Sequence, residues 1–373
     1  MKKMSTVADV LDALTVEGEL YEKYPDGSVR CFACGHRCLI RPGRRGVCKV
    51  RFNKNGVLQV PYGYVSGLQA DPIEKKPFFH FLPGSDALTF GMLGCDFHCS
   101  FCQNHITSQF LRDPASDLAA GYIRRVSAEQ MVKLALQSGA DVIASSYNEP
   151  LITSEWAVSI FRQAVQEGLK CVYVSNGNAT AEVLQYLRPY LSGYKIDLKT
   201  MQERQYRQVG GVLKIVLDSI KQAHELGLWV EVVTLVIPGF NDSVAELMDA
   251  ARFLVSVSPD IPWHVTAYHP DYKMTDPPPT PSSTLIRAAE IGQEAGLHFV
   301  YAGNLVGRVK DYESTFCPHC QALLIKRYGY TIYEYHLTAD GKCPKCAASI
   351  AGVWTEQPRT VRLGGWGMPR AIY

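Results

Sequence analysis

The 373-residue sequence lacks any long apolar run, and its basic and acidic residues nearly cancel. No stretch approaches the roughly 20 apolar residues that cross a bilayer, so we expect no membrane-spanning segment. The chain begins with two lysines, but acidic residues interrupt the stretch after them and leave no apolar signal-peptide region. With 38 basic and 36 acidic residues, it has no global attraction for nucleic acid or an anionic membrane. We therefore expect a cytoplasmic protein without a membrane partner.

The middle of the chain shows an alternating pattern of two kinds of segment. Short β-rich apolar runs alternate there with amphipathic stretches, which is typical of parallel strands joined by helical crossovers. The strands are predicted at 87–92, 141–146, 171–174, 194–198, 229–237, 263–268 and 298–302. The helices are predicted at 128–138, 154–167, 181–190, 212–226, 244–255 and 283–295.

The number and order of these elements indicate the fold class. About seven strand-helix units fit an α/β fold with a partial or full TIM-type (β/α) barrel better than a flat sheet. Ser127, with Gln130 three residues later, forms a capping-box pattern before one helix. We expect a Cys-rich metal-binding segment at 1–86, the barrel at 87–311 and a zinc-ribbon-like tail at 312–373. Active residues of such a barrel lie at the C-terminal ends of its strands.

The sequence contains twelve cysteines, and eleven of them fall in three tight clusters. Clustered cysteines in a reducing compartment indicate metal ligands before disulfides. Only Cys171 stands alone, in an apolar run where a small buried core residue is expected.

The middle cluster comes directly after the strand predicted at 87–92. Cys95, Cys99 and Cys102 have the spacing Cys-x-x-x-Cys-x-x-Cys, and three thiolates in one loop can hold three irons of a 4Fe-4S cluster. The fourth iron then has no nearby cysteine, and an open position is what a catalytic metal needs. The alternative is a zinc site completed by His98 or His105.

The two outer clusters each contain four cysteines. Two Cys-x-x-Cys pairs around a β-rich segment in the tail predict a structural zinc ribbon, with a redox site or second Fe-S cluster as the alternative. The early cluster allows a closed zinc site, a fully ligated Fe-S cluster or unligated thiols, and His36 could replace one ligand. We favour zinc there, although spacing does not decide. The predicted ligands are Cys31, Cys34, Cys38 and Cys48, and Cys317, Cys320, Cys343 and Cys346.

The middle loop, with Phe101 before its third cysteine, resembles the signature loop of radical S-adenosylmethionine (SAM) enzymes. The resemblance implies an oxidoreductase in which the open iron binds the amino and carboxylate groups of SAM. An electron from the cluster then cleaves SAM, and a 5′-deoxyadenosyl radical abstracts hydrogen from a substrate. It also implies a reductant such as flavodoxin or ferredoxin.

Several segments resemble the branch that contains the pyruvate formate-lyase activating enzymes. Tyr147, Asn148 and Glu149 occupy the place of a Gly-Gly-Glu motif that contacts the SAM amino group in relatives, although both glycines are missing here. A carboxylate such as Glu149 can accept from an ammonium, or it can simply lie at a helix entry. The resemblance implies further SAM or substrate contacts by Ser175, Asn176, Asp197, Lys199 and His269, for which an ordinary turn, an ion pair and a loop cap are the alternatives.

The whole chain resembles the radical SAM component of the AmmeMemoRadiSam system. The resemblance combines the early Cys-rich segment, EKKPFFHFLPGS, the cluster loop, SYNEP and the terminal ribbon. It implies partnership with Memo-type and AMMECR-type proteins and fixes no substrate, whether small molecule or protein. The alternatives are a glycyl radical enzyme activase, a zinc-ribbon protein that binds nucleic acid or modifies RNA, and an assembly scaffold.

Overall fold

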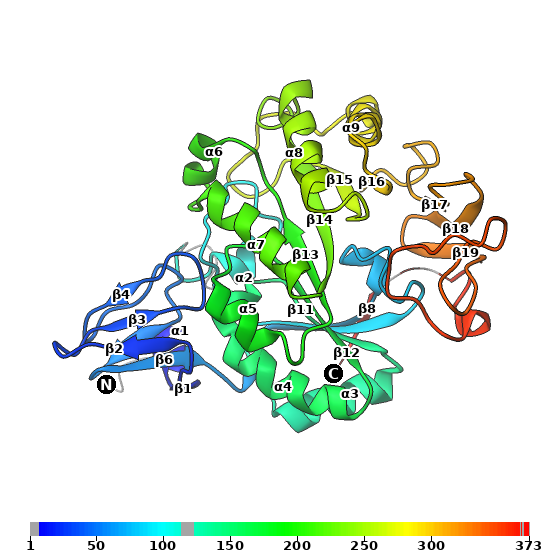
Figure 1. The fold of residues 1–373 in the computed structure, drawn as a ribbon. Helices are drawn as coiled ribbons and strands as arrows, with labels where there is room; N and C mark the ends of the chain where they lie inside the picture. Colours follow the sequence, from blue (N-terminus) through cyan, green and yellow to red (C-terminus); the bar gives the residue numbers. More distant parts are fainter. Residues whose placement is uncertain (1–6, 113–122, 366, 368, 373) are drawn as a thin grey trace.

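A nine-stranded sheet forms the centre of the protein in a computed structural model that describes residues 7–112, 123–365, 367 and 369–372 (Figure 1). Lys2 and Lys3, the two lysines at the start of the chain, lie outside the described residues. The strand order is β16-β15-β14-β13-β12-β11-β9-β8-β20, and neighbours from β9 to β16 are parallel. The parallel strands are β9 (Asp86–Gly91), β11 (Val142–Ser145), β12 (Lys170–Ser175), β13 (Gly193–Asp197), β14 (Trp229–Val236), β15 (Trp263–Ala267) and β16 (Val300–Gly303).

These seven strands confirm the large parallel sheet predicted from the apolar runs. Their residues are almost entirely buried, because helices cover one face and other parts of the chain cover the other. Among the described strands, no hydrogen-bonded pair joins β16 to β9 or β20. The full-barrel alternative is therefore not confirmed.

The connecting helices begin and end close to the predicted positions. Before the first of them, Ser127 accepts from the Gln130 backbone at 3.1 Å while the Gln130 side chain accepts from the Ser127 backbone at 2.8 Å, so the capping box is present. One short helix, α6, was not predicted, because only Tyr206 among its six residues is buried. The helices are α3 (Ala128–Ser138), α4 (Ser154–Gln166), α5 (Ala181–Leu187), α6 (Glu203–Gln208), α7 (Leu213–Glu225), α8 (Val244–Val257) and α9 (Ser282–Glu294).

The sheet extends beyond the predicted limits of 87–311 at both chain ends. Strand β8 (Gly67–Pro72) pairs antiparallel with β9, and β20 (Arg370–Ala371) pairs antiparallel with β8. Segments from the predicted N-terminal and C-terminal regions thus complete one edge of the central sheet.

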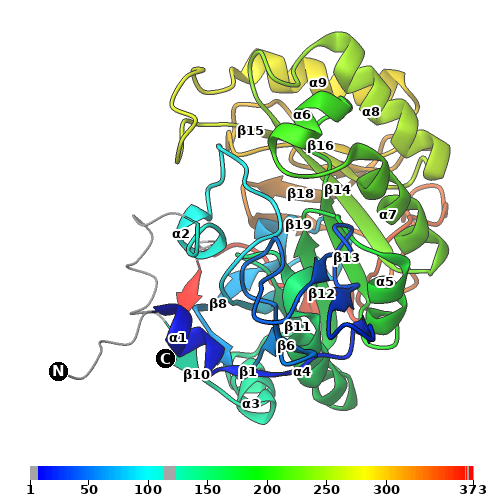
Figure 2. The ribbon, with the colours of Figure 1, turned by 90° about the vertical axis from the view of Figure 1, so that its left-hand side faces the viewer.

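The N-terminal lobe, residues 7–66, lies against α4 and α5 (Figures 1 and 2). Arg51 of the lobe is 1% exposed and forms two 2.7 Å contacts with Glu155 of α4. Nearer the surface, Arg37 contacts Glu182 of α5 at 2.8 Å. The lobe contains α1 (Val7–Asp12), a β1-β6-β5 sheet (Thr15–Glu17, Val57–Pro61 and Phe52–Lys54), a β2-β3-β4 sheet (Tyr21–Lys23, Val29–Cys31 and Leu39–Ile40) and β7 (Tyr64–Val65), which pairs with β10 (Arg124–Arg125).

The ribbon, residues 315–350, lies on the opposite side of the sheet from the lobe (Figure 1). It consists of β17 (Thr315–Phe316), β18 (Leu323–Tyr328) and β19 (Thr331–Tyr335). The buried Arg327 donates to the Phe79 carbonyl and to Thr315, both at 2.7 Å. Buried polar contacts therefore attach the ribbon to the segment that precedes β9.

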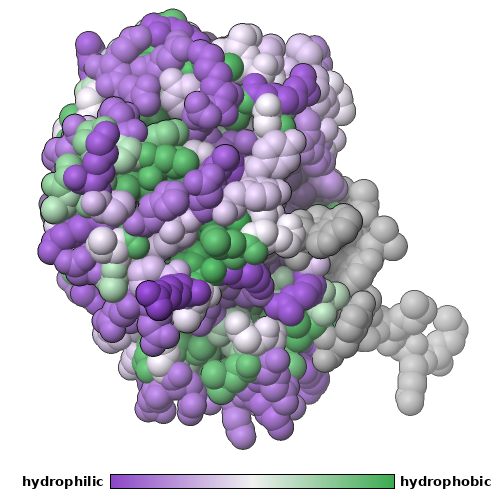
Figure 3. All heavy atoms as spheres, turned by 90° about the vertical axis from the view of Figure 1, so that its right-hand side faces the viewer, coloured by the Kyte–Doolittle hydropathy of each residue, from purple (hydrophilic) through white to green (hydrophobic). Residues whose placement is uncertain are grey.

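The ribbon-side surface carries separate apolar patches among polar residues (Figure 3). Exposed apolar residues near the ribbon include Val306 and Leu363. Among the described residues, no helix has both the length and the apolar character needed to cross a bilayer.

Candidate functional site

A cavity of about 380 Å³ lies at the C-terminal ends of the parallel strands. Barrel-type α/β enzymes place their reactive groups at this edge. The cavity is lined by the three cysteines of the middle cluster and by every predicted cofactor contact except His269: Phe101, Tyr147, Asn148, Glu149, Ser175, Asn176, Asp197 and Lys199. Residues from separate strand ends, as far apart in the chain as Cys95 and Lys199, are thus brought together.

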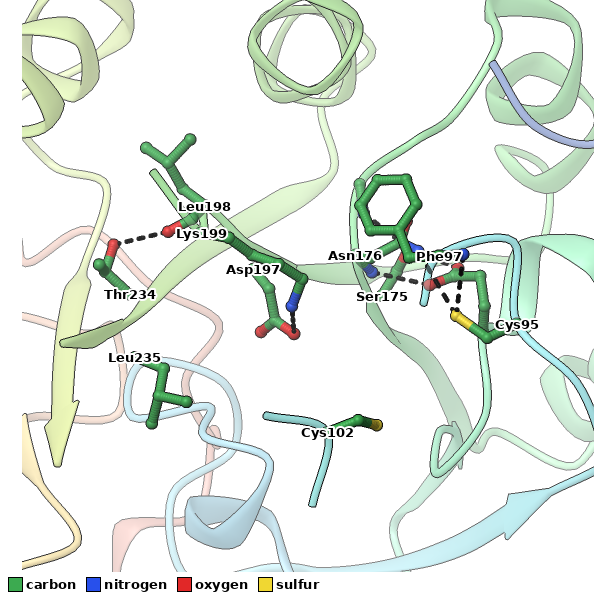
Figure 4. Close-up of polar contacts among 12 residues, drawn as sticks. Cys95, Phe97, Cys102, Ser175, Asn176, Asp197, Leu198, Lys199, Thr234 and Leu235 are labelled. Carbon is green, nitrogen blue, oxygen red and sulfur yellow. Dashed lines mark hydrogen bonds and ion pairs between the residues drawn. The ribbon is translucent and has the colours of Figure 1, made fainter. Parts of the chain in front are cut away.

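The three cluster thiols face this cavity with space between them, as Figure 4 shows for Cys95 and Cys102. Burial raises the pKa of the Cys99 thiol to about 12 and that of the other two above the ordinary value. Free thiolates are therefore disfavoured unless a metal ion replaces the proton. Cys95 Sγ also accepts from the Phe97 backbone N–H at 3.4 Å.

The spacing of these sulfurs fits iron atoms of a cluster better than one zinc ion. The thiols of Cys95, Cys99 and Cys102 do not all lie within 4.8 Å of one another, whereas ligands of one tetrahedral zinc ion lie about 3.8 Å apart. His98 is exposed, and His105 stacks on Tyr272 instead of joining the sulfurs. The zinc alternative at this loop therefore has no support in the structure.

Two buried carboxylates lie behind the cluster loop. Glu149 is 2% exposed and accepts from the Ser175 hydroxyl at 2.7 Å and the Asn176 backbone N–H at 2.8 Å. Asp96 is fully buried and accepts from the side-chain amides of Asn176 and Asn178, both at 2.7 Å. Ser175 and Asn176 thus hold carboxylates in place, as Figure 4 shows in part.

These carboxylates lack a basic partner. Within the described part of the chain, no Lys, Arg or His side chain forms an ion pair with Glu149 or Asp96. Burial, and then the charge of Asp96, raises the pKa of Glu149 to about 8. A cationic ligand in the cavity would offset both the cost of burying the Glu149 carboxylate and its repulsion by Asp96. The ammonium and sulfonium groups of SAM fit this requirement.

The wall formed by the end of β13 carries the opposite charge. Lys195 and Asp197 lie on β13 and Lys199 follows its end, and both lysines contact the one Asp197 carboxylate. Burial alone would lower the pKa of Lys199, but the charge of Asp197 raises it above its usual value. Two cations on one carboxylate leave a net positive charge that suits the carboxylate of an amino acid ligand.

Sequence reasoning assigned no role to a second basic group at the cavity. Lys75 and Lys76 line it and both contact Asp71, which also accepts from the Tyr147 hydroxyl at 2.6 Å. Burial lowers the pKa of Lys76 to about 8. Tyr330, from the turn between β18 and β19, lines the cavity as well. The ribbon thereby contributes to the cavity wall. The sequence gives no sign of this contact, because the ribbon lies far along the chain from the cluster loop.

Tyr147 shows how the missing glycines are accommodated. Its φ is +68°, in the left-handed region that glycine adopts readily. The backbone of this segment therefore follows a path suited to glycine although the side chain is tyrosine. Its hydroxyl contact with Asp71 helps to hold the ring in place.

His269 is the one predicted contact that the structure does not bring to the cavity. It is exposed after β15, and its Nε2 lies 3.1 Å from the Gln103 side chain. Its position matches the loop-cap alternative more closely than a cofactor contact.

The ribbon cysteines form a four-sulfur metal site. The sulfurs of Cys317, Cys320, Cys343 and Cys346 all lie within 4.8 Å of one another, with two pairs at 3.6 Å. A tetrahedral ion with metal-sulfur bonds of about 2.3 Å requires sulfur separations of about 3.8 Å. The site therefore fits one tetrahedral ion, as the two Cys-x-x-Cys pairs predicted.

The four N-terminal cysteines lie in the lobe, on the side of it that contacts the cluster loop. The backbone N–H of Gly35, beside Cys34, donates to the Asn178 carbonyl at 2.7 Å. His36 Nε2 lies 3.2 Å from the Asp96 carbonyl, so this histidine faces the loop.

Comparison with known proteins agrees with this site. Residues 90–253 match the Radical SAM superfamily. The chain is 37% identical over 337 residues to an uncharacterized protein of Methanocaldococcus jannaschii, covering 90% of this chain and 98% of that protein. It is 24% identical over 288 residues to the GTP 3′,8-cyclase of Aquifex aeolicus, covering 69% of this chain and 80% of that enzyme. It is 26% identical over 154 residues to the isethionate sulfite-lyase activating enzyme of Desulfovibrio desulfuricans, covering 40% of this chain and 48% of that enzyme. The part of the chain that contains the three-cysteine loop, residues 90–253, thus belongs to the radical SAM superfamily.

Proposed function

We propose that the protein is an enzyme that reductively cleaves SAM and abstracts hydrogen from a substrate. Cys95, Cys99 and Cys102 would hold the 4Fe-4S cluster. When bound, the cluster and SAM supply the electron and the 5′-deoxyadenosyl radical. The observation that carries the proposal is one cavity that contains three thiols, an anionic wall and a cationic wall.

The side chains of the cavity would bind and orient SAM. Glu149 accepts hydrogen bonds from the SAM ammonium, and Lys199 faces its carboxylate. Ser175 and Asn176 fix the Glu149 carboxylate, since both already donate to it. Phe101 is buried beside the third cysteine and limits water at the cluster. These contacts hold the reacting groups in place while the cofactors supply the chemistry.

The test is release of 5′-deoxyadenosine from anaerobically reconstituted protein with SAM and dithionite. We expect release from the unmodified chain, and none from Cys99→Ala, because the cluster loses a ligand. Cys171→Ala is the matched control, since Cys171 is a buried core cysteine that lies outside all three groups. Continued release from a variant lacking all three loop cysteines would contradict the proposal.

A glycyl radical enzyme activase is the second candidate function. The similarity to an isethionate sulfite-lyase activating enzyme over 40% of the chain favours it. The lobe and the ribbon add structure outside the matched residues 90–253. A glycyl radical formed on a partner enzyme, seen by electron paramagnetic resonance, would support the activase, and its absence with active protein would remove it. Nucleic-acid binding has weaker support, because the net charge is only +2.

The partners and the ribbon metal belong to the same proposal. We propose zinc at the ribbon, flavodoxin or ferredoxin as reductant, and Memo-type and AMMECR-type proteins as partners in the cytoplasm, on the basis of the whole-chain resemblance. Adding purified Memo-type or AMMECR-type protein should change the rate of 5′-deoxyadenosine release. An unchanged rate together with no co-elution would contradict the partnership.

A further inference from the structure

The four N-terminal cysteines converge although they occupy 18 positions of sequence. The backbone N–H of Cys31 donates to the Cys38 carbonyl at 3.0 Å, and Cys34 lies in the turn between these two residues. Cys48 lies in the next loop, where the backbone N–H of Val47 donates to Cys38 Sγ at 3.5 Å. The hairpin and the loop thus bring all four thiols to one region.

These thiols are free and largely buried. Cys31, Cys34 and Cys48 are buried and Cys38 is half-buried, and none forms a disulfide. Four neighbouring, largely buried cysteines without a disulfide indicate a metal-bound group.

Arg51 provides a second, independent observation. It is 1% exposed, and both of its terminal nitrogens contact Glu155, but its Nε has no hydrogen-bond partner. Arg51 comes three residues after Cys48 in the chain. A buried donor beside sulfur ligands fits an anionic group whose sulfurs can accept from it.

The spacing of the sulfurs distinguishes between zinc and an iron-sulfur cluster. No three of the four thiols lie within 4.8 Å of one another, in contrast to the ribbon cysteines. Ligands of one tetrahedral ion lie about 3.8 Å apart, whereas ligands of a cubane bind different irons and lie farther apart. In this chain, the thiols of Cys95, Cys99 and Cys102 likewise do not all lie within 4.8 Å of one another.

The location also favours a redox-active group. Asn178 accepts from the Gly35 backbone and donates to Asp96, the neighbour of Cys95, at 2.7 Å in each case. A Cβ at Gly94 would lie 3.2 Å from the Cys48 carbonyl. Only a thin layer of chain thus separates the two cysteine groups. Zinc has no redox chemistry, so it would gain nothing from this position.

We propose that Cys31, Cys34, Cys38 and Cys48 hold a second iron-sulfur cluster, which accepts one electron from a flavodoxin-type or ferredoxin-type reductant and passes it to the cluster at the cavity. Each transfer oxidises the donor and reduces the acceptor by one electron, and no atom moves. This inference goes beyond SAM cleavage, because the ligand set can be filled whether or not SAM is cleaved.

The experiment uses the full chain with Cys95, Cys99 and Cys102 all replaced by alanine. After anaerobic reconstitution, iron, sulfide and zinc are counted per chain. We expect about four irons and four sulfides to remain with about one zinc, and reduction to produce an electron paramagnetic resonance signal of an Fe-S cluster. Adding Cys34→Ser and Cys48→Ser should remove this iron and leave the zinc, while adding Cys171→Ser should leave both.

The result that overturns the proposal is a triple variant with no bound iron, whether it holds two zincs or one. A redox-silent site would also overturn it. If the variants do not fold, the unmodified chain decides: about eight irons and one zinc support the second cluster, and about four irons with two zincs contradict it. Failure of SAM cleavage would leave these counts unchanged, so the two proposals fail separately.

Discussion

The N-terminal lobe and the ribbon each contribute four cysteines, yet they place them in different surroundings. The ribbon sulfurs lie within 4.8 Å of one another, and Cys346 is exposed. The lobe sulfurs are spaced more widely, are mostly buried and lie against the cluster loop. The number of sulfurs is therefore a poor guide to the metal. Their separation and their neighbours carry the information.

The two regions also differ in what they present to the cavity. The loop beside the lobe carries the buried carboxylates Asp96 and Glu149, which lack a basic partner among the described residues. On the ribbon side, the cavity is lined by Tyr330 together with Lys75 and Lys76. The lobe-side wall thus favours a cation, whereas the wall that suits an anion is formed by Lys195, Asp197 and Lys199, and the ribbon adds a tyrosine. Four predictions test this contrast.

The largest effect is expected from removing the ribbon metal with Cys320→Ser and Cys343→Ser. Structural zinc contributes directly to the free energy of folding. We expect loss of the zinc and a fall in melting temperature of at least about 10 °C, at about 2–4 °C per kcal/mol. SAM cleavage should also weaken, because Tyr330 loses its support. Calorimetry and zinc counting measure both effects, with Cys171→Ser as control. An unchanged melting temperature would show that the ribbon folds without its metal.

The next effect is expected from Glu155→Gln, which breaks the buried pair with Arg51. Both side chains are about 2% exposed, so the arginine would be left charged and unpaired. Breaking such a pair costs about 3–5 kcal/mol. Chemical denaturation should show this loss, and iron bound by the lobe should fall while ribbon zinc stays constant. Replacing both partners, as Arg51→Met with Glu155→Leu, should recover part of the stability. Equal loss in the single and double variants would argue against a paired charge.

A smaller effect, on binding instead of folding, is expected at Glu149. Its pKa is raised to about 8, so without a cation the folded protein prefers the protonated carboxyl. This group therefore lowers stability as pH rises from about 4.5 towards 8, and SAM binding relieves that cost. Between pH 6 and 7.5 we expect SAM affinity to rise with pH, by at most about tenfold per unit. Glu149→Gln should bind SAM more weakly and show no such rise in titration calorimetry. A parallel rise in the variant would assign the pH dependence to another group.

The central fold could be predicted because buried parallel strands consist of continuous apolar runs. The capping box at Ser127 was equally local, since its two residues are three positions apart. Strands β8 and β20 were missed because neither has an apolar run. Segments of two to six residues also carry too little pattern to predict that β8 pairs with β9 and β20 with β8. The short strands of the lobe were missed for the same reason.

The cysteine loop of the site could also be predicted, because spacing within eight residues fixes its chemistry. Asp96 was available as a signal, since it comes directly after Cys95, but its burial depends on Asn176 and Asn178 from another strand end. Lys76 and Tyr330 are 254 positions apart and meet at the cavity only through the fold. Sequence alone offers no signal for such a pair.

The smallest effect is expected where the two regions are alike, at their exposed ion pairs. Arg37 of the lobe contacts Glu182, and Lys326 of the ribbon contacts Glu334 at 3.1 Å, with both partners of each pair more than one third exposed. Such pairs contribute about 0–1 kcal/mol because water and salt screen them. Arg37→Ala and Lys326→Ala should each lower the denaturation free energy by less than about 1 kcal/mol and leave iron and zinc unchanged. If Arg37→Ala instead lost iron, the surface contact with α5 would be needed to hold the lobe cysteines together. The contrast between lobe and ribbon would then depend on how each region is attached, and no longer on its buried groups alone.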